Sequence, residues 1–176
     1  MTASAKKHIR VALAGNPNCG KTTIFNILTN ANAHVGNYPG VTVERRVGHF
    51  ELDKYKVELI DLPGVYGLSS SSPEEMVAAD ELLNNRPDFI LNVLDSSNLQ
   101  RNLYLTMQLA ELNLPMLLVF NMIDDAKKRG FEFDYDKINK YFGVTTVETI
   151  GSANYGIDKL KAELARRLDA PSLLPN

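Results

Sequence analysis

Residues 15–22 are the part of the sequence whose residue types and spacing point most directly to chemistry. Two glycines bracket four residues, and a lysine and a threonine follow, which is the complete P-loop pattern. The apolar residues 11–14 precede the motif and a stretch of helical character follows it. In this context backbone N–H groups would surround a phosphate, Lys21 would bridge two phosphates and Thr22 would bind Mg²⁺. The predicted nucleotide contacts are Gly15, Asn16, Pro17, Asn18, Cys19, Gly20, Lys21, Thr22 and Thr23.

Asp61 supplies the carboxylate that a magnesium site beside a P-loop needs, and we expect it to bind the ion through water. It begins the only Asp-x-x-Gly sequence in the chain, directly after a predicted strand. Gly64 has no side chain, so its N–H could approach the γ-phosphate and make the following loop sensitive to hydrolysis. Thr42 is the only serine or threonine between residues 30 and 60. We therefore assign it as the second hydroxyl ligand of Mg²⁺, provided that the domain works as a switch.

Guanine recognition needs a carboxylate for the donors of the base and an amide that fixes the surrounding loop, which an Asn-x-x-Asp sequence supplies. Two such sequences compete, starting at Asn92 and at Asn121. Asn121 follows an unbroken apolar run and lies where a strand ends, so we choose Asn121 and Asp124. Met122 stands where lysine is usual, which would weaken stacking on the base without changing its hydrogen-bonding pattern. A final base loop is placed at Ser152, Ala153 and Asn154.

Short apolar runs alternate with segments of helical period, which predicts an α/β fold. Six strands are predicted, at residues 9–14, 41–52, 55–61, 89–94, 116–120 and 144–150. Only Asp53 and Lys54 separate the second strand from the third, so these two should form an antiparallel hairpin at the edge of a mostly parallel sheet. Helices are predicted at residues 21–30, 74–83, 99–112, 135–141 and 157–168. The expected architecture is the three-layer, Ras-like fold of P-loop GTPases, with helices on both faces of the sheet.

Local signals mark the boundaries of several segments. Ser72 and Pro73 predict a sharp helix start, because serine caps a helix and proline suits its first turn. The last helix should dock on the sheet through an apolar stripe at spacings of three and four residues. We read residues 1–170 as one G domain and residues 171–176 as a linker stub. Its parts are the P-loop (15–22), switch I (31–43), switch II (61–76), the base loop (121–124) and the final base loop (about 151–154).

The amino-acid composition limits the classes of protein to which this chain can belong. With 176 residues, of which 44% are hydrophobic, the chain can bury one continuous core. Lysine and arginine total 19 against 21 aspartates and glutamates, so no basic field is available to hold nucleic acid. A single cysteine, no signal sequence and no apolar stretch near ~18 residues predict a cytoplasmic domain that does not itself span a membrane.

Five segments carry a resemblance to a known family: residues 15–18, 35–45, 61–64, 98–106 and 121–124. They resemble the N-terminal G domain of the FeoB family of prokaryotic ferrous-iron transporters, over essentially the whole chain. The resemblance implies a GTP-binding and GTP-hydrolysing domain that regulates iron uptake. It also implies a helical domain and a multi-pass region in the inner (cytoplasmic) membrane as partners, with self-association as a further possibility. His8, His34 and His49 lack metal-ligand spacing, so we expect no direct Fe²⁺ binding here.

Val65 stands directly after the Asp-x-x-Gly sequence, where many regulatory GTPases have the glutamine that orients the attacking water. The family resemblance implies that K⁺ lies beside the phosphates instead, held by Asn18 and by backbone carbonyls around Gly36 and Tyr38. The implied enzyme is a slow, K⁺-stimulated GTPase. The residues assigned to catalysis are Lys21, Thr42, Asn18 and Gly64.

Three interpretations stay open. Cys19 replaces the serine that is common in the family; it either fills a tight loop or carries a thiol whose oxidation blocks nucleotide entry. The chain could instead be a soluble GTPase of ribosome or tRNA-modification type, which shares the same motifs. It could also be a nucleotide-dependent binding module with little hydrolysis, which Val65 favours.

Overall fold

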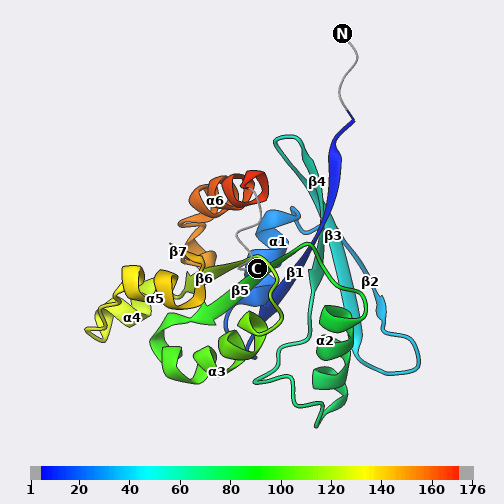
Figure 1. Ribbon diagram of the computed structural model, residues 1–176, viewed down its shortest axis with the longest axis horizontal. Coiled ribbons are helices and arrows are strands. Elements are labelled where there is room, and N and C mark those ends of the chain that lie inside the picture. Colours follow the sequence, from blue (N-terminus) through cyan, green and yellow to red (C-terminus); the bar gives the residue numbers. More distant parts are fainter. Residues whose placement is uncertain (1–4, 171–176) are drawn as a thin grey trace.

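Seven strands form one sheet in the order β2-β3-β4-β1-β5-β6-β7, and helices cover both of its faces (Figure 1). The computed structural model describes residues 5–170. The strands are β1 (Lys7–Gly15), β2 (Ala33–Asn37), β3 (Glu44–Leu52), β4 (Tyr55–Asp61), β5 (Phe89–Asp95), β6 (Met116–Asn121) and β7 (Thr145–Glu148). The α-helices are α1 (Lys21–Leu28), α2 (Pro73–Leu83), α3 (Leu99–Ala110), α4 (Ile123–Lys128), α5 (Tyr135–Phe142) and α6 (Ile157–Asp169). Within the described residues there are also two short 3₁₀ helices, η1 (Ser96–Asn98) and η2 (Gly151–Ala153). The predicted three-layer α/β fold is confirmed.

The central strands of the sheet are parallel. Strand β1 lies between β4 and β5, and β6 and β7 continue the parallel order beyond β5. Strands β3 and β4 form the predicted antiparallel hairpin, with Leu52 opposite Tyr55 and Asp53 in the left-handed region at φ 50. The hairpin is not at the edge of the sheet as predicted, because β2 pairs with the outer side of β3. Because the carboxyl ends of parallel strands meet at one edge, the loops after β1, β4 and β6 gather there. These are the loops that carry the candidate site.

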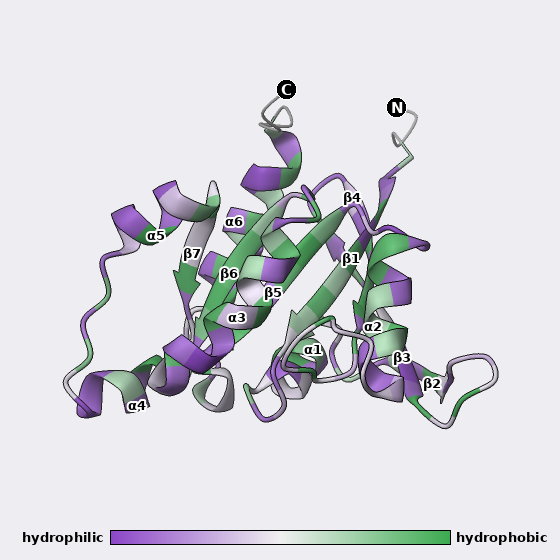
Figure 2. Cartoon of the chain, turned by 60° about the horizontal axis from the view of Figure 1, so that its bottom comes forward, coloured by the Kyte–Doolittle hydropathy of each residue, from purple (hydrophilic) through white to green (hydrophobic). Residues whose placement is uncertain are grey.

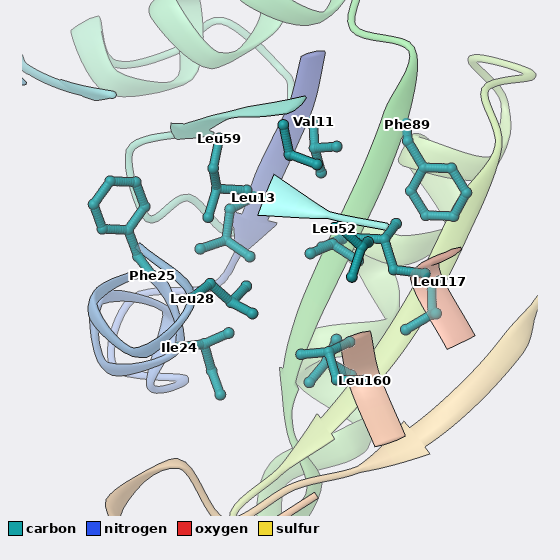
Figure 3. Packing of buried hydrophobic residues seen from close by; sticks show 14 of the residues in the cluster. Val11, Leu13, Ile24, Phe25, Leu28, Leu52, Leu59, Phe89, Leu117 and Leu160 are labelled. Carbon is teal, nitrogen blue, oxygen red and sulfur yellow. The ribbon is translucent and has the colours of Figure 1, made fainter. Parts of the chain in front are cut away.

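Side chains along the strands alternate between two hydrophobic clusters. On one face Leu13, Leu59 and Leu117 pack with α1 and α6, and Figure 3 shows Ile24 and Leu160 from these helices reaching the same cluster. On the other face the strands pack with α2, α3 and α5. Both faces of the central strands are covered, so these strands are hydrophobic along nearly their whole length (Figure 2). This double burial fixes the sheet as a rigid base for the loops.

The structure corrects the sequence-based outline in two places. The sheet has seven strands and not six, because Ala33–Asn37 forms β2 within switch I (31–43), where no strand was predicted before residue 41. The short helix α4 (Ile123–Lys128) follows β6 and was not predicted. The remaining elements shift only at their ends: the second predicted strand begins at Glu44, the first helix ends at Leu28 and the last strand covers Thr145–Glu148.

The start of α2 agrees with its sequence signal. Ser72 caps the helix, and its Oγ accepts a hydrogen bond from the backbone N–H of Glu75 at 3.1 Å. Pro73 is the first helical residue, where its missing N–H costs no hydrogen bond. The Glu75 carboxylate in turn accepts from the backbone N–H of Ser71 at 3.1 Å. This exchange fixes the point at which switch II becomes helical.

Across residues 5–170, none of the helices has both the length and the apolar character that a bilayer span requires. The linker stub predicted at residues 171–176 lies outside the described residues.

Candidate nucleotide-binding site

A cavity of about 520 Å³ lies at the carboxyl edge of the sheet, where the loops after β1, β4 and β6 meet. Its wall is lined by the P-loop and the first turn of α1, together with one residue from each of the other two loops. The lining residues are Asn16, Pro17, Asn18, Gly20, Lys21, Thr22, Thr23, Gly64 and Met122. The fold therefore brings most of the predicted phosphate contacts together with Gly64 and the start of the base loop.

The P-loop glycines are required by close packing around the loop. A Cβ atom on Gly15 would lie 2.6 Å from both the Cys19 Sγ and the carbonyl oxygen of Val93. A Cβ atom on Gly20 would lie 2.1 Å from the Asn121 Nδ2, and Gly20 has a positive φ of 87. Asn18 also has a positive φ, 62, which curls the backbone. Such a curl of successive N–H groups ahead of a helix N-terminus forms an anion-binding concavity.

Lys21 and Asp61 form an ion pair across the cavity wall. The Lys21 residue is 8% exposed, so its ammonium group is held largely out of solvent. The two residues come from α1 and from the end of β4, and the parallel pairing of β1 with β4 brings these elements together. The structure thus places the predicted phosphate-binding lysine and the predicted magnesium carboxylate in direct contact. Thr22 lies beside Lys21 and is exposed to the cavity.

The Asn121 side chain connects the P-loop to the loop after β7. Its Nδ2 donates to the carbonyl of Cys19 at 3.0 Å. Its Oδ1 accepts from the Thr149 hydroxyl at 3.0 Å and from the Gly151 N–H at 3.0 Å. Asn121 is 3% exposed, so these bonds are shielded from water. We call this arrangement the Asn121 latch. Thr149 was not predicted from the sequence as part of the site. Its position near the end of the last predicted strand was the only signal in the sequence that could have indicated it.

The other predicted base residues surround the latch. Met122 adopts the left-handed conformation at φ 56 and begins α4, and Asp124 lies in the first turn of that helix with its side chain 38% exposed. Ser152 and Ala153 belong to η2, directly after Gly151, and Asn154 follows at φ 58. The competing Asn92 is buried inside β5, where its Oδ1 accepts from the Thr106 hydroxyl at 2.6 Å.

The switch I residues lie apart from this cavity. Thr42 is exposed in the loop between β2 and β3, which projects from the edge of the sheet (Figure 1). Gly36 lies in β2 opposite Arg45, and Tyr38 is buried, with the Arg45 guanidinium 5.8 Å from its ring centre. Burial raises the pKa of the Tyr38 hydroxyl to about 12. The pairing of β2 with β3 accounts for this separation, because it holds residues 33–37 along the sheet edge.

No group of three or more His, Cys, Asp or Glu side chains gathers into a metal-binding cluster among residues 5–170. The carboxylate of Asp61, paired with Lys21, and the hydroxyl of Thr22 are two polar groups near the P-loop that could contribute to a metal site.

Cys19 is buried beneath the P-loop, and its backbone carbonyl belongs to the Asn121 latch. Burial raises the pKa of its thiol to about 11, although the nearby Lys21 ammonium acts in the opposite direction. Because the thiolate is the reactive form, we expect iodoacetamide to alkylate Cys19 at pH 7.5 at least ~100-fold more slowly than free cysteine. Mass spectrometry would follow the reaction, with the guanidinium-unfolded chain as the fully reactive control. Rapid alkylation of the folded chain would contradict the buried, protonated thiol.

Comparison with known proteins gives the same assignment over nearly all of the described chain. Residues 9–164 match the family described as "Ferrous iron transport protein B". The chain is 52% identical over 153 residues to an Fe(2+) transport protein A/Fe(2+) transporter FeoB fusion protein of Porphyromonas gingivalis, covering 86% of this chain and 18% of that protein. It is 46% identical over 156 residues to the Fe(2+) transporter FeoB of Legionella pneumophila, covering 86% of this chain and 21% of that one.

Among solved structures, the cytosolic domain of the T. maritima FeoB iron transporter in a GDP form superimposes with a TM-score of 0.90. The two share 38% sequence identity, and the match covers 96% of this chain and 66% of that structure. The chain spans about a fifth of the length of the curated relatives given above. The P-loop, the Asn121 latch and these matches together show that the chain belongs to the ferrous iron transport protein B family and is its G domain.

Proposed function

We propose that this chain binds GDP and GTP at the carboxyl edge of its sheet and hydrolyses GTP. The Asn121 latch carries the proposal, because it joins the phosphate-binding loop to the two loops that would hold the base. A cavity lined by the P-loop and Met122 then accommodates one elongated ligand with a phosphate end and a base end. The T. maritima relative is described in a GDP form, which supports a guanine nucleotide as that ligand.

We further propose that the whole protein is a ferrous iron transporter of a prokaryotic inner membrane, in which this domain lies in the cytoplasm. The names of the relatives support this role, since each is called an Fe(2+) transporter. The helical and membrane domains of such a transporter would be the partners of this chain. The domain would then transmit its nucleotide state, GDP-bound or GTP-bound, to those partners.

Thr22 and Asp61 are the groups that would hold Mg²⁺. The Thr22 hydroxyl lines the cavity at the start of α1, and the Asp61 carboxylate already faces the P-loop through its ion pair with Lys21. Bound there, Mg²⁺ would offset negative charge on the phosphates. Lys21 adds the second positive charge, and the backbone of Gly64 faces the same cavity. Thr42 remains our proposal for a further ligand, and its exposed place beyond β2 leaves it free of the core.

Val65 shapes how hydrolysis would proceed. Its side chain is buried and apolar, and its N–H donates to the carbonyl of Gly15 at 3.2 Å, so this residue cannot orient a water molecule. Without a water-orienting residue at this position, hydrolysis would depend more strongly on positive charge beside the phosphates, in addition to that of Mg²⁺ and Lys21. We propose that K⁺ supplies this charge, bound by the exposed Asn18 in the cavity wall. Gly36 and Tyr38 do not line this cavity; the Tyr38 N–H donates to Val43 at 2.9 Å within its own turn.

Hydrolysis and its dependence on K⁺ can be tested together. We expect single-turnover phosphate release from GTP and Mg²⁺ to be faster in KCl than in NaCl at equal ionic strength. Asn18→Ala should remove this difference and change the Kd for GDP by less than about threefold, since Asn18 adds one exposed contact. Equal stimulation in variant and parent would refute the K⁺ assignment.

One second function is favoured by a specific observation. The buried Val65 also suits a binding module that holds GTP without hydrolysing it, because such a module needs no water-orienting residue. Phosphate release no faster than that of free GTP, in KCl and in NaCl alike, would select this alternative. Tight GTP binding in the same sample would show that the site itself is intact.

A further inference from the structure

We propose that helix α3 positions switch II for the γ-phosphate, and that Gln108 and Arg101 are the positioning residues. The inference rests on the proposed function, because it concerns how Gly64 is held at the same nucleotide. It gives a role to α3 (Leu99–Ala110), which overlaps the segment 98–106 and which the site described above does not use. Neither side chain lines the nucleotide cavity. Each acts through the residues that follow Gly64.

Two contacts and one close approach join α3 to residues 66–68. The Gln108 Oε1 accepts a hydrogen bond from the backbone N–H of Leu68 at 2.8 Å. The Arg101 guanidinium lies 4.2 Å from the centre of the Tyr66 ring, a cation–π geometry. Between them, a Cβ atom on Gly67 would lie 3.0 Å from the Gln108 Oε1 and from the Tyr104 ring. The backbone of switch II therefore rests directly on the surface of α3.

The same helix is tied to the start of the P-loop. The Asn16 Nδ2 donates to the backbone carbonyl of Arg101 at 3.4 Å. One turn further along, the Thr106 hydroxyl donates to Asn92 at 2.6 Å, and the Asn92 Nδ2 donates to the carbonyl of Ala14 at 3.4 Å. Arg101 thus contacts the P-loop through its backbone and switch II through its side chain. Helix α3 is a common support for both walls of the phosphate site.

Gly64 lies between these two supported segments. A Cβ atom on Gly64 would lie only 3.0 Å from the Pro17 Cα, so its backbone already touches the P-loop. The next residue, Val65, donates its N–H to Gly15 at 3.2 Å, and the α3 contacts begin one residue later. Loosening residues 66–68 would therefore loosen Gly64. The P-loop keeps its own hydrogen bonds, so GTP binding should suffer and GDP binding should not.

The test compares the Kd of a fluorescent GDP with that of a fluorescent, non-hydrolysable GTP analogue. Gln108→Leu should raise the Kd for the GTP analogue about two- to tenfold, the range expected for one lost hydrogen bond. Gln108→Glu keeps an acceptor oxygen and should bind both nucleotides like the parent. Arg101→Met should raise the Kd for the GTP analogue about two- to fivefold. Arg86→Met is the matched control, since Arg86 is exposed ahead of β5 and bonds to the carbonyl of Leu112.

A second readout does not depend on nucleotide. The chain contains no tryptophan, so Tyr66→Trp introduces a single tryptophan at the contact with Arg101, whose emission can be excited selectively over that of the tyrosines. Adding Gln108→Leu should shift its emission to longer wavelength as residues 66–68 leave α3, whereas Gln108→Glu should not. If the parent binds neither nucleotide, the proposed function fails while the emission still reports the contact. Unchanged emission in the Gln108→Leu variant, or equal loss of GDP and GTP-analogue affinity, would overturn the inference.

Discussion

Lys21→Met is expected to weaken the binding of GTP by at least ~100-fold and that of GDP by at least ~10-fold, because the ammonium group can bond to two phosphates of GTP but to only one of GDP. No other lysine lines the cavity that could replace it among residues 5–170. The same change leaves the Asp61 carboxylate without its ion-pair partner. The free energy of unfolding of the ligand-free chain should therefore also fall, by about 3 kcal/mol. Titration calorimetry measures the first effect and urea unfolding the second.

A double variant separates the loss of nucleotide affinity from the loss of stability caused by Lys21→Met. In Lys21→Met/Asp61→Asn no charge is left unpaired at this position, so most of the lost stability should return. Nucleotide binding should stay weak, since the ammonium group is still missing. If the double variant binds GDP like the parent, Lys21 stabilises the fold and does not bind phosphate.

Asp124→Asn is expected to lower the affinity for GDP by ~100-fold and to create affinity for xanthosine diphosphate. A carboxylate accepts the two donors on the guanine edge, and each such charge-assisted bond contributes about 1.5 kcal/mol or more. Xanthine carries an oxygen in place of the amino group, and an asparagine amide can donate to it. Competition of both diphosphates against fluorescent GDP measures the change.

Asp125→Asn is the matched control for this exchange. Asp125 is the next residue of α4, and the Lys128 ammonium lies 3.8 Å from the carboxylates of both Asp124 and Asp125. The two substitutions therefore remove the same charge from the same helix turn. Asp125→Asn should leave nucleotide selectivity unchanged. A similar loss of GDP selectivity in both variants would contradict the assignment of Asp124 to the base.

The parts of the fold that the sequence predicted are those whose side chains are buried in a regular pattern. The central strands are buried on both faces, and the stripe of Ile157, Leu160 and Leu164 packs α6 on the sheet. Strand β2 has no such pattern: most of its side chains are exposed, and Gly36 and Asn37 favour turns. It exists because β3 pairs with it, which a local pattern cannot reveal. Helix α4 escaped prediction because it has six residues, of which only Ile123 and Ala126 are buried.

The candidate site divides in the same way. The P-loop is a continuous segment whose chemistry is encoded in adjacent residues, so its place and backbone shape followed from the motif. The Lys21–Asp61 pair and the bond from Thr149 to Asn121 join residues far apart in the chain, and only the folded sheet brings them together. Thr42 was assigned by elimination, and elimination says nothing of where its loop lies. Its role as a magnesium ligand therefore stays a prediction.

The Asn121 latch has a consequence for how the ligand is selected. One amide fastens the backbone beneath the phosphates to the backbone beside the base, so these two regions cannot adjust independently. In the proposed complex, a guanine nucleotide would meet this preassembled wall in the same form whether it carries two phosphates or three. Discrimination between GDP and GTP would then depend on residues 61–76, whose Gly64 lines the cavity, because residues 31–43 lie apart from it. Recognition of the base and sensing of the last phosphate would thus fall to different segments of the chain.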